Sequence, residues 1–221
     1  MSTFSITGVT LPKWPAMVVV GKTVSPEQAK EIIIRTSGLS FHSNEHSFVK
    51  RLYDVAGIKC DKHGWADYDS RDARCNELGI IRGEYLRNSQ VCSSYINGPH
   101  GWIDWRGNVG CRTFNIGKWP KADEVLGEWS AIAEAFPYLD LKCQLFSGEQ
   151  CEEGTTALVQ YNVSGGVVSA MNPVDDLGVP KDNNTWSFMR PGGELGCTIE
   201  QFEEAFNLVK KIAKERKDGG K

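Results

Sequence analysis

The sequence lacks the features that would place it at a membrane or on duplex DNA. It has no apolar run of about twenty residues, and no charged segment leads into an apolar one as in a secretory leader. Neither sign of charge is in large excess, because 25 Lys and Arg oppose 28 Asp and Glu for a formal net charge of −3. This balance removes the broad electrostatic attraction behind non-specific binding of nucleic acid. We therefore expect a cytoplasmic protein whose partners include no extended nucleic acid and no membrane.

The sequence also lacks a disulfide framework. Its seven cysteines are an odd number and are widely spread, which is typical of small buried thiols rather than of paired bridges. With 40% hydrophobic and 24% charged residues, the 221-residue chain has the composition of a folded globular protein with a real core. The cysteines therefore predict no covalent scaffold for that core.

Two patterns suggest metal ligands. The segment His42–His46 has the H-x-x-E-H form of inverted zinc proteases, and Cys60, His63 and Cys75 offer three thiolate or imidazole ligands. Each pattern is incomplete, because an N-cap at Asn44 would leave the first histidine outside the helix, and the cysteine group has no evident fourth ligand. We expect no cofactor, and keep as metal alternatives His42, His46, Cys60, His63 and Cys75.

Hydrophobic periodicity predicts the elements of the first half of the chain. Ser25, Pro26 and Gln28 have the spacing of a capping box with proline at the first helical position. Residues 58–78 show no apolar periodicity and are expected to be irregular. The expected strands are 16–20, 79–86 and 109–116, and the expected helices are 26–35 and 44–57.

The second half of the chain is more regular. A helix is expected over 121–136, followed by strands at 139–146, 156–163 and 167–171 and by a helix over 198–217. Gly165 and Gly166 indicate a tight hairpin, and Thr198 with Gln201 forms a second capping box. This order predicts an α+β fold, an antiparallel sheet with helices packed mainly on one face.

Aromatic and arginine side chains gather in two stretches, residues 95–112 and the long loop 172–197. Aromatic rings can stack on a base while arginine neutralises a phosphate, so these stretches are typical of a binding surface. Packing in the core is the alternative interpretation for Trp102 and Trp105, and it stays open at this point. The candidate ligand-binding residues are His100, Trp102, Trp105, Arg106, Asn108, Arg112, Trp186 and Arg190.

Residues 95–172 resemble the YubB-type ferredoxin-like domain of phage and plasmid proteins. The resemblance rests on Trp102 and Trp105, on Lys118-Trp119-Pro120 before a helix, and on the helix end Phe136-Pro137-Tyr138-Leu139-Asp140-Leu141. It rests also on Asn108-Val109-Gly110-Cys111-Arg112, with Phe114 after it, where the family has Asn-Trp-Gly-Thr-Lys. The resemblance implies a mobile-element origin, host-cell cytoplasm as the location, and a ferredoxin-like sheet. It supplies no catalytic residues.

These observations predict two segments and a binding function. Residues 1–94 form an N-terminal α/β segment packed on the core, and residues 95–221 form the ferredoxin-like domain with the loop 172–197 and a C-terminal helix. We expect a phage-type, non-catalytic binding protein that counters a host defence by sequestering a small nucleotide-like signal or by capping a host defence protein. One alternative is a metal- or His-dependent nucleotide hydrolase. Another is a structural or regulatory phage protein acting as a homo-oligomer.

Overall fold

The first described strand, β1 (Ala16–Gly21), lies inside a sheet whose other strands come much later in the sequence. The computed structural model describes residues 16–37, 39, 46–81, 102–113, 122–146, 159–171 and 198–220. The strand order is β2-β1-β3-β4-β5, and every neighbouring pair is antiparallel. The other strands are β2 (Gly110–Thr113), β3 (Asp140–Phe146), β4 (Val159–Ser164) and β5 (Val167–Met171). The sheet thus takes strands from both predicted segments of the chain.

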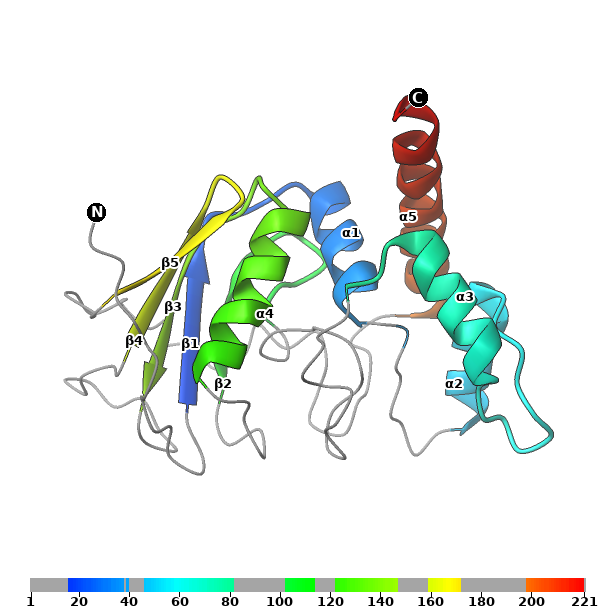
Figure 1. Cartoon of the computed structure of the whole chain (residues 1–221). Helices are drawn as coiled ribbons and strands as arrows, with labels where there is room; N and C mark the ends of the chain where they lie inside the picture. Colours follow the sequence, from blue (N-terminus) through cyan, green and yellow to red (C-terminus); the bar gives the residue numbers. More distant parts are fainter. Residues whose placement is uncertain are drawn as a thin grey trace.

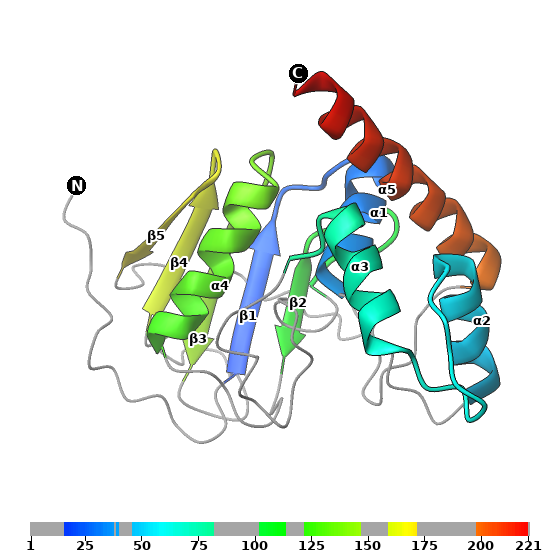
Figure 2. The same ribbon diagram turned by 45° about the vertical axis from the view of Figure 1, so that its right-hand side comes forward.

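All the described helices lie on one side of this sheet (Figure 1). They are α1 (Pro26–Ser37), α2 (His46–Ala56), α3 (Tyr68–Leu78), α4 (Ala122–Ala135) and α5 (Ile199–Gly219). Helix α4 contacts β4 and β5, while α5 runs along α1, α2 and α3 (Figure 2). The α+β class, the antiparallel sheet with helices on one face and the C-terminal helix are therefore confirmed. Within the described ranges, no helix is both long and apolar enough to cross a membrane.

The core lies between the sheet and the helices. Leu141 and Cys143 of β3 and Tyr161 of β4 alternate with more polar neighbours, and all three are buried among the helix residues of the core. Trp129 of α4 is fully buried, and Trp102 meets its ring edge-on with centroids 5.6 Å apart. This T-shaped pair is a favoured aromatic geometry, so two large rings fix how the segment before β2 packs on α4.

Both predicted capping boxes are present. At α1 the Gln28 backbone N–H donates to Ser25 Oγ at 3.2 Å, and the Ser25 N–H donates to Gln28 Oε1 at 2.9 Å. Thr198 and Gln201 make the same pair of bonds at the start of α5, at 3.2 and 3.0 Å. Each box satisfies two backbone donors that have no partner inside the helix.

Helix α3 corrects the expectation that residues 58–78 are irregular. Asp67 caps it by accepting the Ser70 N–H at 2.9 Å, and Gly79 ends it in the left-handed conformation at φ 63°. Only Cys75 and Leu78 of this helix are buried, so it has no apolar stripe for periodicity to detect. The strand expected from Gly79 is wrong at its start, because Gly79 is the helix cap; residues 82–86 lie outside the described ranges.

The predicted Gly-Gly hairpin joins β4 to β5. Gly165 and Gly166 have φ of 58° and 80°, and Ser164 pairs with Val167 across the turn. Two consecutive positive φ angles make a turn whose twist matches that of the strands. The hairpin fixes the register in which Asn162 lies opposite Ser169 and Gln160 lies opposite Met171.

Candidate functional site: an amide chain on the sheet face opposite the helices

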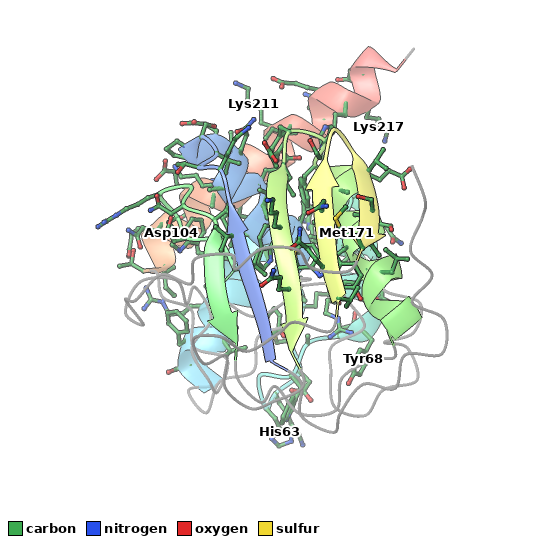
Figure 3. The ribbon with its side chains drawn as sticks, turned by 90° about the vertical axis from the view of Figure 1, so that its left-hand side faces the viewer. His63, Tyr68, Asp104, Met171, Lys211 and Lys217 are labelled. Atoms are coloured by element: carbon green, nitrogen blue, oxygen red, sulfur yellow. The ribbon has the colours of Figure 1, made fainter. Side chains whose placement is uncertain are left out.

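The sheet face opposite the helices carries a row of amide side chains. Figure 3 looks onto this face, and the described helices lie behind the strands. Because side chains alternate along a strand, the residues between the buried core positions point to this side. They include Lys142 and Gln144 of β3, Gln160 and Asn162 of β4, and Met171 of β5.

The amides form a continuous hydrogen-bonded chain. Gln144 Nε2 donates to Gln160 Oε1 at 3.0 Å, and Gln160 Nε2 donates to Asn162 Oδ1 at 2.8 Å. Asn162 Nδ2 then donates to the Met171 sulfur at 3.1 Å. The sulfur fixes the direction, since a thioether can only accept, and each amide must then present its N–H₂ group to the next one.

Burial changes along this chain of amides, from one end to the other. Gln144 and Gln160 are only 2% and 3% exposed, although none of the described helices lies on this face. Asn162 and Met171 are half-buried, and Lys142 is exposed. Buried amides are costly unless hydrogen-bonded, so this network is a specific feature of the fold rather than a solvated surface. It presents a hidden end and an end that solvent reaches.

At the exposed end of the amide chain, three different polar groups lie in one register row, that is, directly opposite one another on neighbouring strands. Lys142 lies opposite Asn162, and Asn162 lies opposite Ser169. Directly opposed residues on antiparallel strands have Cβ atoms about 5 Å apart, so an ammonium, an amide and a hydroxyl lie within reach of one small ligand. In the next row, Asp140 forms an ion pair with Lys22, which compensates its charge.

Gln144, Gln160 and Asn162 were not among the candidate residues from the sequence. The alternation of polar and apolar residues in β3 and β4 would have placed them on one sheet face. The pairing of β3 with β4 places Gln144 opposite Gln160, and the pairing of β4 with β5 brings Met171 beside Asn162; composition and periodicity do not give these registers.

The aromatic-arginine segment forms a tight turn before β2. The Asp104 carboxylate accepts the backbone N–H groups of Arg106 and Asn108 at 2.9 and 3.0 Å, and the Asn108 side-chain amide at 2.8 Å. Arg106 is exposed and Asn108 is half-buried. The structure therefore brings Arg106 and Asn108 together around one carboxylate, which leaves the Arg106 guanidinium at the surface.

The two tryptophans of this segment lie against the core. Trp102 is 2% exposed and packs on Trp129, so its ring faces contact protein; the packing interpretation accounts for it in this structure. Trp105 is partly buried and packs against the same core. The turn precedes β2, one edge strand, whereas Met171 belongs to β5, the other edge (Figure 3). The turn and the amide chain are therefore separate features of the sheet.

The remaining candidate ligand residues have no described side chain. Arg112 is a residue of β2 whose backbone lies opposite Val18, and Val18 in turn lies opposite Gln144. Arg112 thus occupies the register row that contains Gln144, Gln160 and Met171. His100, Trp186 and Arg190 lie outside the described residues.

The proposed metal ligands are not gathered where the structure describes them. Cys75 is fully buried in α3, and His63 lies in an exposed turn whose N–H donates to Asp61. Cys60 is half-buried, and burial together with the Asp54 carboxylate raises the pKa of its thiol. Across the described ranges, no three His, Cys, Asp or Glu residues converge on one point. His46 is the first residue of α2, and His42 lies outside these ranges.

A second exposed feature lies in the turn between α2 and α3. Trp65 and Tyr68 are 65% and 71% exposed, and the Arg71 guanidinium lies 4.9 Å from the Tyr68 ring centroid. Asp61 orders this turn by accepting the Trp65 N–H at 2.9 Å. The turn belongs to the helical side of the molecule, so it is not continuous with the amide chain (Figure 2).

Comparison with known proteins gives no relative: no protein-family model, curated protein or solved structure matches this chain.

Proposed function

We propose that this protein binds a small nucleotide-like ligand on the sheet face opposite the described helices, at the end of the amide chain that solvent reaches, without chemically changing it. The observation that carries the proposal is the hydrogen-bonded amide chain Gln144–Gln160–Asn162, which runs from a buried end to an end that solvent reaches. Ligand sites commonly combine a few fixed polar groups with a surrounding buried surface.

The chemistry of the amide chain favours ligand binding over catalysis. Amides carry both a donor and an acceptor, and they match the donor and acceptor pattern on the edge of a nucleobase. They neither titrate near neutral pH nor act as nucleophiles, unlike the groups that perform acid-base or covalent catalysis. The amide chain therefore supports binding and release of an unaltered ligand.

The resemblance to phage and plasmid proteins supplies the biological part of the proposal. A protein of that origin that holds a nucleotide-like molecule would act by sequestering a signal of a host defence system. In the other form of this proposal, the same protein caps a host defence protein. The amide chain favours the first form, because its few polar groups suit a small molecule rather than a protein surface.

The test is a binding panel with the purified chain. Calorimetry with AMP, ADP-ribose, cyclic di-AMP and cyclic GMP-AMP should detect binding of at least one compound, and heating should release it with unchanged mass. Gln160→Leu should weaken that binding by about tenfold or more, because it interrupts the amide chain. Asn207→Leu, at an exposed position of α5, is the matched amide-to-apolar control and should leave binding unchanged.

Each other outcome selects an alternative. A released product of different mass would establish the hydrolase alternative, and its dependence on added zinc would distinguish the metal-dependent form. Failure of every compound to bind would reject sequestration. Affinity capture from a host lysate would then test capping, and sedimentation at increasing protein concentration would test oligomerisation.

A further inference from the structure

We propose that Lys142, Asn162 and Ser169 form an anion subsite that holds a phosphate group of the ligand. This inference rests on the proposed function and adds the place of the ligand's phosphate on the sheet. The phosphate lies at the exposed end of the amide chain, beside Asn162, because Gln160 and Gln144 at the other end are only 3% and 2% exposed.

The direction of the amide chain is the first argument. Gln144 donates to Gln160, Gln160 donates to Asn162, and Asn162 donates to the Met171 sulfur, so the side-chain dipoles align with their positive ends toward the exposed end. Aligned hydrogen bonds polarise one another, which strengthens the terminal donor. A chain of neutral amides thus presents its most positive group where solvent reaches it.

The present partner of that terminal donor is the second argument. Asn162 Nδ2 donates to the Met171 sulfur at 3.1 Å, and a thioether is a weak acceptor. A phosphate oxygen is a much better acceptor, because hydrogen bonds to an ionised oxygen are about twice as strong as those between neutral groups. The Asn162 amide, the terminal donor of the amide chain, is therefore bonded to a weak acceptor that a phosphate oxygen can replace.

The charge beside it is the third argument. Lys142 lies opposite Asn162 in the register and is exposed, and no carboxylate in the described part of the chain forms an ion pair with it. The closest acidic position on the same strand face, Asp140, is occupied by its ion pair with Lys22. Ser169 completes the row with a hydroxyl donor on β5. An ammonium, an amide N–H₂ and a hydroxyl together match the oxygens of one phosphate group.

Inorganic pyrophosphate is the probe for this subsite, because it contains the anion without a base. The parent protein should bind it in calorimetry, and Lys142→Gln should lower the affinity by about tenfold or more. Lys142→Arg should restore most of the affinity. Lys62→Gln makes the same charge change in the α2–α3 turn and should have no effect.

Two further variants test the amide direction. Asn162→Asp keeps the shape but replaces the donor by an anionic acceptor, so it should abolish pyrophosphate binding. Met171→Leu removes the weak acceptor and should leave the affinity equal or higher. Thermal melting of each variant shows whether it folds, and for any variant that melts early, pyrophosphate binding is measured below its melting temperature.

The outcomes separate the subsite from the proposed function. Equal pyrophosphate binding by the parent and Lys142→Gln, or none by the parent, would overturn the subsite. A panel compound that binds Lys142→Gln as tightly as the parent would also overturn it while leaving the proposed function in place. Pyrophosphate binding that needs Lys142, with no nucleotide bound, would instead retain the subsite and reject the nucleotide.

Discussion

Arg216, near the end of α5, reaches the buried carboxylate of Glu31 on α1 with 2.7 Å between Nη1 and Oε1. Arg35 donates to the same oxygen at 2.9 Å, and the Tyr138 hydroxyl donates to Oε2 at 3.3 Å. The Glu31 side chain is 5% exposed. The Glu31 carboxylate thus connects α1, α5 and the turn before β3. It is the buried charge at the contact between α1 and α5.

Glu31→Gln should destabilise the protein more than loss of its exposed partner Arg216. The change leaves the largely buried Arg35 guanidinium without its counter-charge, and breaking a buried pair costs about 3 kcal/mol or more of unfolding free energy. Arg216→Gln should cost about 1 kcal/mol or less, because its side chain is 53% exposed. Urea unfolding measures both values. Lys211→Gln, which removes an exposed pair with Glu215, is the control, and an equal loss there would contradict the role of burial.

Gly107→Ala should be among the most damaging single changes in the described part of the chain. Gly107 has φ of 89°, and an added Cβ would lie 2.0 Å from the Val24 carbonyl oxygen. The Gly107 carbonyl oxygen also accepts the Val24 N–H at 2.8 Å, so the two backbone segments cannot move apart without losing that hydrogen bond. We expect a loss of about 3 kcal/mol or more in urea unfolding.

Gly64→Ala is the matched control for that change. Gly64 has a similar φ of 83°, but an added Cβ meets nothing within 4 Å. It should therefore cost only the backbone strain of about 1 kcal/mol. Similar losses for the two variants would show that strain alone, rather than the approach of Val24, makes glycine necessary at position 107.

Tyr161→Phe should leave the protein equally stable or stabilise it by about 1 kcal/mol. Its hydroxyl is buried and has no hydrogen-bond partner among the described residues. Removing a buried polar atom without a partner ends a desolvation cost and keeps the packing of the ring. Thermal and urea unfolding test this expectation. A loss of about 1 kcal/mol or more would show that the hydroxyl has a partner, such as a bound water.

Stability should decrease above about pH 10. Burial and the Glu31 carboxylate raise the pKa of Tyr138 above its ordinary value of 10.0, and burial does the same for Tyr161. The unfolded state loses these protons above that value while the folded state keeps them, so alkali favours unfolding. Urea unfolding between about pH 9 and pH 11 should show the decrease, and Tyr161→Phe should reduce its slope. An unchanged slope would contradict the contribution of Tyr161.

The sequence by itself determined the elements whose signals are local. The capping boxes at Ser25 and Thr198 and the turn at Gly165 and Gly166 appear where they were expected, because hydrogen bonds between residues three or fewer positions apart need no distant partner. Helix α3 was missed for the complementary reason. Its local cap at Asp67 is present in the sequence, but only two of its residues are buried, so no apolar stripe marked it.

Only the tertiary structure decided which polar and aromatic residues lie in the core and which form a surface. The sequence left Trp102 open between binding and packing, and its contact with Trp129 of α4 favours packing. Gln144 and Gln160 look like ordinary polar positions of a strand, yet antiparallel pairing places them opposite each other, and hydrogen bonds join them to Asn162 in the next register row. A strand's own residues define its two faces, whereas register and the side on which the helices pack are fixed by contacts between distant parts of the chain.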